Sequence, residues 1–380
     1  MLTTETYQQY LSILQEELIP AMGCTEPISL AYAAALARET LGVLPQSVEL
    51  RVSPNIIKNV KSVIVPHTGN LRGIEAAAAA GIIAGDANSK LEVLSRVTAE
   101  QIRDIARYLS QTPISVTPSD SGLVFDIQIE VKGASHRALV RIAGGHTHIV
   151  RVEKDDQVLL SKSCSSDSSR PRTDHQALNV EDIVRFADTV SVSDIQPILD
   201  RQILCNTAIA EEGLRGNWGA SIGRVLLHAY GDDVHNRAKA MAAAGSDARM
   251  SGCELPVVIN SGSGNQGLTA SLPVIVYAKH LGASQEQLYR ALTVSNLITI
   301  HLKTGIGCLS AYCGATSAGC GAGAGITYLY GGRAHEIAHT IVNAVAINSG
   351  MICDGAKASC ASKIASAVEA GLLGMEMQMQ

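Results

Sequence analysis

The chain has 380 residues, of which 46% are apolar and 17% are charged, a mixture typical of a globular protein long enough for two domains. A net charge of −5 gives no basic surface, so nucleic acid is not an expected partner. The opening residues are polar and acidic, and no apolar run reaches the roughly 18 residues of a membrane span, so we expect a cytoplasmic protein without a membrane partner. In that compartment, nine cysteines favour metal binding or catalysis over a disulfide framework.

The first predicted helix covers about residues 3–20, and a second one begins close to Cys24. Thr25 fits the N-cap of the second helix and Pro27 fits its first turn, so Cys24 would lie just before the helix. The positive end of a helix dipole lowers the pKa of a thiol and favours the thiolate. Cys24 is therefore a candidate catalytic residue, and the alternative is a small buried side chain.

Between about residues 48 and 160, short β-branched runs alternate with turn residues and with two helical segments, at 69–85 and 98–109. The runs are VELRVSPN, KSVIVP, ISVTPS, VFDIQIEV, RALVRIAG and a hairpin, HTHIVRVEKDDQVLL, that turns near Asp155. This pattern predicts an α/β domain over residues 1–160. His67 lies in a loop after one predicted strand, where it could bind a ligand or simply be solvated.

Residues 161–174 are rich in serine and are predicted to form a linker, which makes Cys164 incidental. Strand signals nearly vanish after it, so residues 175–380 should form a mainly α-helical domain. The glycine-rich segment around Ser261 and Asn265 leads into a helix and could present N–H groups to an anion. It matches neither a Walker loop nor a dinucleotide fingerprint, so a small carboxylate is as suitable as a phosphate.

Five cysteines fall in the last eighty residues, beside glycines that allow tight turns. Forty residues separate Cys313 from Cys353, and Cys360 follows seven residues later. These intervals match neither paired CxxC zinc motifs nor the usual ferredoxin spacings. Spacing alone leaves two interpretations open, which are a shared metal site and buried structural thiols.

Five motifs covering nearly the whole chain resemble, in order and spacing, those of the iron–sulfur L-serine dehydratase alpha-chain family, and most closely its L-cysteine desulfidase branch. They are MGCTEP, VPHTG, SGSGNQGLTASLPV, IHLKTGIGCLSAYCGATSAG and MICDGAKASC. The resemblance implies an α+β fold, with an N-terminal α/β domain like the serine dehydratase beta domain and an all-α cluster-binding domain. Family members usually continue some tens of residues beyond EAGLLGME, so the helical domain is expected to be short at its C-terminus.

The resemblance also implies an oxygen-labile [4Fe-4S] cluster, and the family's ligand positions match Cys313, Cys353 and Cys360. Cys24 occupies the place of the catalytic cysteine of the desulfidase branch, where serine dehydratases carry a Ser/His-containing motif. Cys308 and Cys320 match no ligand position, and we expect them to serve packing.

Three thiolates would leave one iron without a protein ligand, as a Lewis-acid catalyst requires. The implied reaction is α,β-elimination from L-cysteine to pyruvate, ammonia and hydrogen sulfide. The alternatives are L-serine dehydration, a noncatalytic relative that binds small carboxylates, and a zinc enzyme using the same thiolates. We expect a homo-oligomer, with a homodimer favoured. The catalytic residues would be Cys24 and Lys303, and the substrate-binding residues Thr25, Glu26, His67, Ser261, Asn265 and Gly267.

Overall fold

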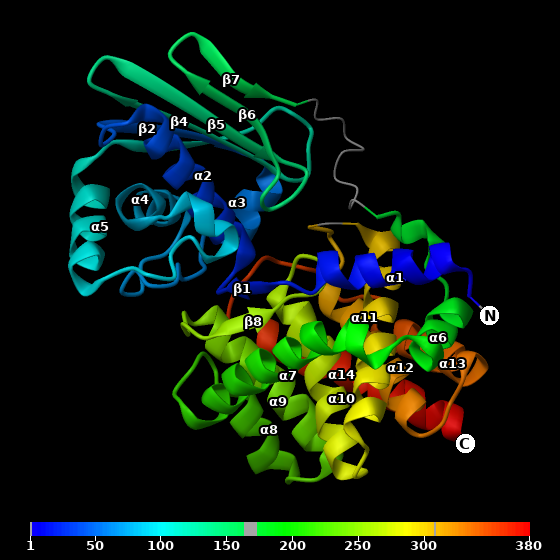
Figure 1. Ribbon diagram of the computed structural model, residues 1–380. Coiled ribbons are helices and arrows are strands. Elements are labelled where there is room, and N and C mark those ends of the chain that lie inside the picture. Colours follow the sequence, from blue (N-terminus) through cyan, green and yellow to red (C-terminus); the bar gives the residue numbers. More distant parts are fainter. Residues whose placement is uncertain (1, 163–172, 308) are drawn as a thin grey trace.

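The structure is a computed structural model that describes residues 2–162, 173–307 and 309–380. Figure 1 shows an α/β part above a larger bundle of helices, which confirms the predicted α+β fold class. Among the described residues, no helix combines the length and the apolar character that crossing a membrane requires.

The α/β part is built on a six-stranded sheet with the order β3-β2-β4-β5-β6-β7. Strands β2 and β3 are parallel, and every other neighbouring pair is antiparallel. Ile127, Ile129 and Val131 alternate along β4 and are fully buried. One face of the sheet is therefore covered by helices (Figure 1). The strands are β2 (Ser47–Val52), β3 (Ile114–Pro118), β4 (Asp126–Gly133), β5 (His136–Ala143), β6 (Ile149–Lys154) and β7 (Gln157–Ser161).

Four α-helices and a short 3-10 helix complete this part: α2 (Thr25–Leu41), α3 (Pro54–Val60), α4 (Ile74–Ala84), η1 (Ala87–Glu92) and α5 (Ala99–Gln111). Helices α2 and α4 pack closely because they meet through alanine and glycine. A Cβ added to Gly81 would lie 2.1 Å from the carbonyl oxygen of Ala31, so only glycine fits there. Small residues thus bring the two helix backbones together in a protein with few aromatic side chains.

The predicted helices and most of the predicted strands are present, including the β6–β7 hairpin with its turn at Asp155. The prediction differs from the structure around residue 55. The stretch after Ser53, predicted to continue a strand, forms α3, because Pro54 favours the first turn of a helix. The KSVIVP run forms no strand and contributes only an isolated bridge between Ile64 and Arg72.

The helical part contains α6 (Val180–Thr189), α7 (Val192–Arg215), α8 (Ile222–Tyr230), α9 (Val234–Met250), α10 (Gly264–His280), α11 (Gln285–Ile306), α12 (Gly314–Leu329), α13 (Ala334–Asn348) and α14 (Cys360–Met379), with the short η2 (His175–Ala177) before them. Helix α12 packs against α10, α11, α13 and α14. Its Gly319 meets the backbone of Ala367 in α14, where an added Cβ would approach the carbonyl oxygen to 2.1 Å.

The chain begins beside the helical part and then crosses into the α/β part (Figure 1). Helix α1 (Thr4–Glu17) packs on α6 and α7, and the hydroxyl of Tyr7 donates to Asp194 at 2.6 Å. Strand β1 (Pro20–Met22) then pairs antiparallel with β8 (Pro256–Val258), which precedes α10. The division into domains at residues 1–160 and 175–380 stays a prediction, and most of the predicted linker, with Cys164, lies outside the described residues.

Candidate active site

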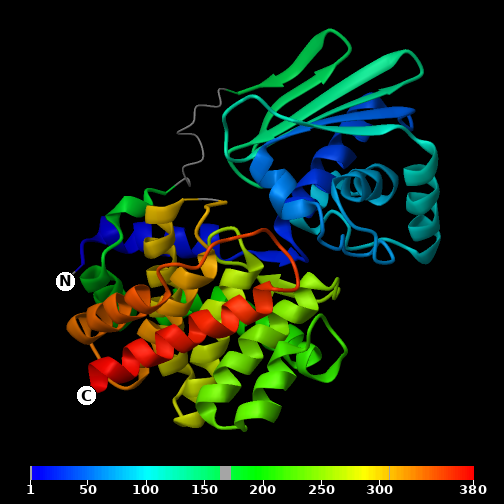
Figure 2. The ribbon, with the colours of Figure 1, turned by 180° about the vertical axis from the view of Figure 1, so that it is seen from behind.

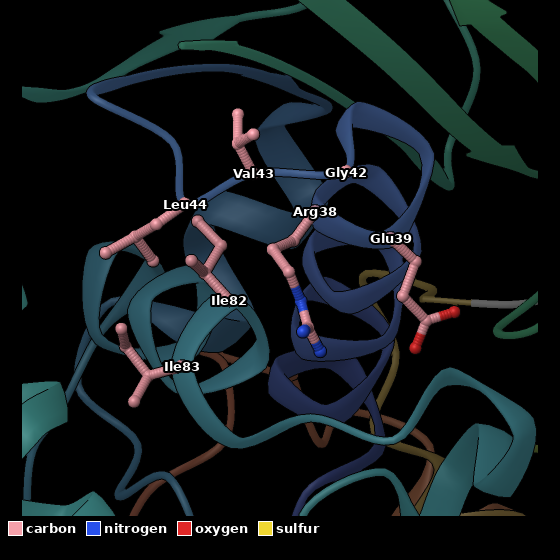
Figure 3. Close-up of a pocket in the computed structure, with 7 residues that line it drawn as sticks. All are labelled: Arg38, Glu39, Gly42, Val43, Leu44, Ile82 and Ile83. Atoms are coloured by element: carbon pink, nitrogen blue, oxygen red, sulfur yellow. The ribbon is translucent and has the colours of Figure 1, made fainter. Parts of the chain in front are cut away.

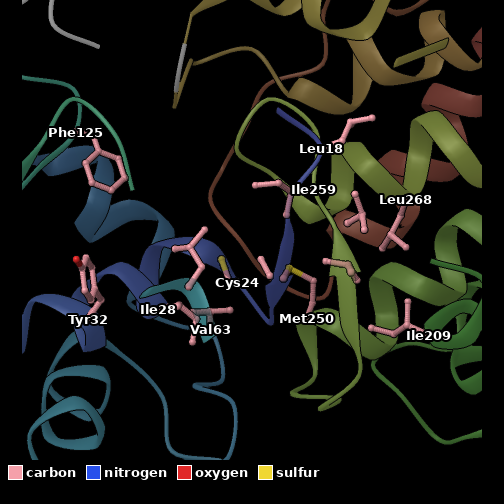
Figure 4. Close-up of a cluster of buried hydrophobic side chains, with 14 of the residues drawn as sticks. Leu18, Cys24, Ile28, Tyr32, Val63, Phe125, Ile209, Met250, Ile259 and Leu268 are labelled. Atoms are coloured by element: carbon pink, nitrogen blue, oxygen red, sulfur yellow. The ribbon is translucent and has the colours of Figure 1, made fainter. Parts of the chain in front are cut away.

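Cys24 lies where the chain enters the α/β part, directly between β1 and α2. It is the N-cap residue of α2, a position one residue before the predicted Thr25, and its side chain is only 2% exposed. Figure 4 shows it between side chains of the α/β part, such as Ile28 and Val63, and side chains of the helical part, such as Met250. The thiol therefore lies in a buried position between the two parts.

A carboxylate is held against this thiol. Cys24 Sγ donates to Glu26 Oε2 at 3.0 Å, and the hydroxyl of Thr25 donates to the same oxygen at 3.1 Å. The other carboxylate oxygen accepts from Asn59 Nδ2 at 2.8 Å. The Thr25 hydroxyl also lies 3.0 Å from the carbonyl oxygen of Gly262, which ties this cluster to the glycine-rich loop of the helical part.

The predicted lowering of the Cys24 pKa by the helix N-terminus is wrong for this structure. Burial raises the pKa of the Cys24 thiol well above its ordinary value, and the neighbouring Glu26 carboxylate adds to the rise. Burial also works against the charged form of Glu26, yet the pKa of Glu26 is lowered, because His146 lies close by and Cys24 and Asn59 donate to it. The pair is therefore held as a protonated thiol and a carboxylate.

The glycine-rich loop brings three contacts together, each at a different glycine. A Cβ on Gly262 would lie 2.9 Å from the His146 ring, and one on Gly264 would lie 2.3 Å from Arg249 Nε. The predicted substrate-binding Gly267 instead meets the carbonyl oxygen of Val258, where a Cβ would approach to 2.0 Å. Packing alone accounts for a glycine at 267, while the first two glycines make room for the imidazole of His146 and the guanidinium of Arg249.

The other predicted substrate-binding residues flank this loop. Asn265 Oδ1 accepts from Arg249 Nη1 at 3.1 Å. Ser261 has a positive φ of 50° and its hydroxyl donates to Asn260. His67, also at positive φ, lies one residue after Pro66, which contacts Gly23 next to the candidate thiol. Its Nδ1 is 3.1 Å from Glu254 and its buried Nε2 has no hydrogen-bond partner.

The three predicted cluster cysteines come from two paired segments and the start of a helix. Cys313 is the N-cap of α12 and its N–H donates to Met351, while the N–H of Cys353 donates back to Ala311 at 2.7 Å. Cys360 is the first residue of α14. Figure 2 shows the segment between α13 and α14 rising toward the α/β part. There Gly355 fits against Lys58, whose carbonyl oxygen would be 2.4 Å from an added Cβ.

Burial raises the pKa of both Cys313 and Cys360, and each also feels the thiol of Cys353. Lys363 and Lys303 act in the opposite direction on Cys313, and Arg249 does so on Cys360. Lys303 is 8% exposed and donates to the carbonyl oxygen of Gly307 at 2.6 Å. The two lysines near Cys313 suit a group that is held by thiolates, since their charges offset part of the negative charge.

One orphaned polar atom lies beside this set. Gln266 is 5% exposed, its Oε1 has no hydrogen-bond partner, and a Cβ on Gly314 would lie 2.5 Å from the Gln266 side chain. Across residues 2–162, 173–307 and 309–380, no three His, Cys, Asp or Glu side chains are close enough to hold a single metal ion. A cluster distributes its ligands over several irons, so the three cysteines and their surroundings are compatible with one.

Of the two cysteines expected to serve packing, Cys308 and Cys320, the structure describes only Cys320. Cys320 is 2% exposed in the middle of α12, as expected for a packing residue. Cys308 lies outside the described residues.

Sequence reasoning missed four side chains of this site: Asn59, His146, Arg249 and Gln266. His146 lies in the loop before β6, stacks edge-on against Phe125 at 4.9 Å, and has a buried Nε2 without a partner. Burial lowers the pKa of His146, although Glu26 acts in the opposite direction. A signal existed for Arg249, because it is a positive charge next to a methionine at the end of an alanine-rich run.

A hollow lies at the other end of α2, away from Cys24. It is lined by Arg38, Glu39, Gly42, Val43, Leu44, Ile82 and Ile83 (Figure 3). Helix α2 has 17 residues, so a rise of about 1.5 Å per residue puts this hollow roughly 25 Å from Cys24. It takes no part in the cluster of polar groups described above.

The fold and the site define a two-part α+β protein with a buried thiol–carboxylate pair facing a cysteine-rich segment. The family model for the serine dehydratase alpha chain matches residues 88–380. The chain therefore belongs to the serine dehydratase alpha chain family, which confirms the predicted membership. The cysteine desulfidase branch stays a prediction.

Curated relatives are similar in sequence to this protein over almost its whole length. A UPF0597 protein of Desulfitobacterium hafniense is 60% identical over 371 residues, covering 98% of this chain and 86% of the relative. UPF0597 proteins of Lachnoclostridium phytofermentans and Finegoldia magna are 51% and 47% identical, covering 98% and 97% of this chain and 89% and 88% of the relatives.

Proposed function

We propose that this protein is an iron–sulfur lyase that converts L-cysteine to pyruvate, ammonia and hydrogen sulfide. The observation that carries the proposal is the Cys24 thiol, which is buried at the start of α2 and whose Sγ donates a hydrogen bond to Glu26 Oε2 at 3.0 Å. A protonatable pair in a buried site is suited to moving a proton to and from a substrate carbon. Membership of the serine dehydratase alpha chain family supports an elimination of this type.

Cys313, Cys353 and Cys360 would hold a [4Fe-4S] cluster. When bound, it would supply an iron without a protein ligand, which acts as a Lewis acid toward the substrate's leaving group.

The Cys24–Glu26 pair would act as a proton relay. The sulfur of Cys24 takes the proton from the substrate's Cα while its own proton passes to Glu26 Oε2, with which it already shares a hydrogen bond. Cys24 is therefore a thiol before and after the transfer, so a raised pKa does not prevent it from acting as a base. Asn59 and Thr25 hold the carboxylate toward the thiol.

The electrons of the Cα–H bond form the Cα=Cβ bond, and the Cβ–S bond breaks to release sulfide. The proton on Glu26 is available to the departing sulfide, which restores the carboxylate. The aminoacrylate product tautomerises to an imine, and water hydrolyses this imine to pyruvate and ammonia. No oxidant or reductant is needed.

L-Serine differs from L-cysteine only in its leaving group, so serine dehydration is the alternative reaction of the same site. A noncatalytic protein that binds small carboxylates is the other alternative, and zinc bound by the same thiolates is a third. One set of assays separates all four.

The test is anaerobic reconstitution with iron and sulfide, followed by metal analysis and by assays of pyruvate and sulfide with L-cysteine and with L-serine. We expect about four irons per chain, and pyruvate with an equal amount of sulfide from L-cysteine. Pyruvate from L-serine alone would make the protein a dehydratase, and zinc in place of iron would overturn the cofactor assignment. A protein that binds iron but forms no product from either amino acid would instead be the noncatalytic protein that binds small carboxylates.

The variant Cys24→Ala isolates the relay from the cluster. We expect it to retain iron and to lose at least about 100-fold in turnover, the usual contribution of a positioned acid–base group. Cys205→Ser on α7 is the matched control, because it also removes a thiol but lies outside the site, and it should retain both iron and activity. Loss of iron from Cys24→Ala would make Cys24 a cluster ligand instead.

A further inference from the structure

Arg249 is a buried cation without an anionic partner. It is the penultimate residue of α9, and its side chain is 3% exposed. Its Nη1 donates to Asn265 Oδ1, which is uncharged, and its buried Nε has no partner. No carboxylate among the residues that the structure describes lies within ion-pair distance of it. Burying a charge is costly unless an opposite charge compensates it, so an unpaired guanidinium at this depth indicates a ligand that supplies the anion.

The chain makes room for this guanidinium at the start of a helix. Gly264 is the first residue of α10, and a Cβ there would lie 2.3 Å from Arg249 Nε. The N-cap residue Ser263 makes no side-chain capping bond, so the first N–H groups of α10 are not capped by it. Helix N-termini attract anions through these N–H groups and the helix dipole. The cation and the helix terminus therefore converge on one place.

The surroundings of Arg249 reach both halves of the proposed site. Its Nε packs against Gly264, and the carbonyl oxygen of nearby Gly262 accepts from the hydroxyl of Thr25, the residue after Cys24. On the other side, Gln266, the residue after its partner Asn265, lies against Gly314, the residue after Cys313. A carboxylate bound by this guanidinium would therefore have its neighbouring carbon atoms between the proposed base and the cysteine-rich segment. In an α-amino acid, the carbon attached to the carboxylate is the one that loses the proton.

We infer that Arg249, positioned by Asn265 and by the amino end of α10, binds the α-carboxylate of the substrate and restricts the site to free α-amino acids. This inference deepens the proposed function and rests on it for the identity of the reaction. Carboxylate binding itself is measurable without turnover.

The direct test is isothermal titration of the reconstituted protein with L-alanine, which carries the carboxylate but no leaving group, and with L-alaninamide, which lacks the carboxylate. The wild-type protein should bind L-alanine and should bind L-alaninamide about 10- to 100-fold more weakly, as expected for the loss of a charged hydrogen-bonded pair. Arg249→Met should lose this preference. Equal binding of the two compounds by the wild-type protein, or no binding of L-alanine, overturns the inference.

Because a buried arginine variant can fail to fold, a second variant keeps Arg249 in place. Asn265→Asp puts a carboxylate of nearly the same shape 3.1 Å from the guanidinium. The new pair should raise the melting temperature and at the same time weaken L-alanine binding about 10- to 100-fold, because the variant supplies its own anion. A variant that binds L-alanine as tightly as the wild-type protein contradicts the inference.

Asn217→Asp is the matched control. Asn217 also accepts from an arginine, Arg224, at 3.0 Å, but both residues are at the surface, outside the site. This variant should leave L-alanine binding unchanged. The outcomes also separate the two proposals, since L-alanine binding without any turnover of L-cysteine would retain the carboxylate site and remove the lyase.

Discussion

Gly264→Ala tests whether Arg249 is confined as the structure has it. An alanine Cβ would lie 2.3 Å from Arg249 Nε and 2.6 Å from Val257 Cγ2. Non-bonded heavy atoms prefer about 3.5–4.0 Å, so at least one neighbour has to move by roughly 1 Å. Val257 is fully buried in β8 and Arg249 is 3% exposed, which leaves little room for either.

Overpacking of this kind costs about 1–3 kcal/mol. Replacing a helical glycine by alanine stabilises the folded protein by at most about 1 kcal/mol, and by less at the first residue of the helix. We therefore expect a lower free energy of unfolding by about 1–2 kcal/mol, measured by urea denaturation. L-Alanine binding should weaken as well, because the displaced guanidinium no longer meets the amino end of α10.

Gly305→Ala is the stability control. Gly305 is in the last turn of α11, and a Cβ there would meet nothing within 4 Å, so this variant should be neutral or up to about 1 kcal/mol more stable. The reasoning is refuted if Gly264→Ala has both the stability and the L-alanine affinity of the wild-type protein.

Three further predictions use other parts of the structure. Glu26→Gln should retain iron and lose turnover at least about 100-fold, because the amide cannot take the proton of Cys24; wild-type rates would contradict the relay. Cys353→Ser should lose iron and activity together in metal analysis and assay, whereas retained iron would remove Cys353 from the ligand set. Burial raises the pKa of Glu17 to about 7 from 4.5, so stability falls as the pH rises from about 4.5 to about 7. Glu17→Gln should remove this fall and, in denaturant unfolding at pH 8, be more stable than the wild-type protein by up to about 3 kcal/mol. The control Glu39→Gln, on the exposed surface of α2, should show no such gain. The prediction is wrong if Glu17→Gln and the wild-type protein show the same pH dependence of stability.

The sequence was sufficient where local patterns dominate. Alternating residues predicted β4, β5 and the hairpin of β6 and β7, and the motifs predicted family membership. It was insufficient around Ser53, where the predicted strand run VELRVSPN extended to Asn55 although Pro54 starts a helix. The three-residue pairing of β1 with β8 was not predictable either, since neither segment is long enough to give a periodic signal.

For the site, the sequence identified residues but not their surroundings. It placed Cys24 at a helix terminus, which by itself lowers a thiol pKa, but the burial and the adjacent Glu26 that reverse the direction arise only from tertiary structure. Arg249 and His146 were missed for the same reason. Each has a buried nitrogen without a hydrogen-bond partner, Arg249 Nε and His146 Nε2, and such an atom can be identified only once distant segments are brought together.

The pairing of β1 with β8 has a consequence for when Cys24, the proposed base, meets the rest of its site during folding. Pro20 pairs with Val258, more than two hundred residues later in the chain, and Cys24 follows directly after this strand. Contacts between such distant segments form late, because a long loop must be closed first. During synthesis, the thiol can reach Glu26 early but cannot meet Arg249 or the glycine-rich loop until α9 and α10 have emerged. The surroundings of Cys24 are therefore completed only when most of the chain has been synthesised. By then, the segment with the proposed cluster cysteines is the next to emerge.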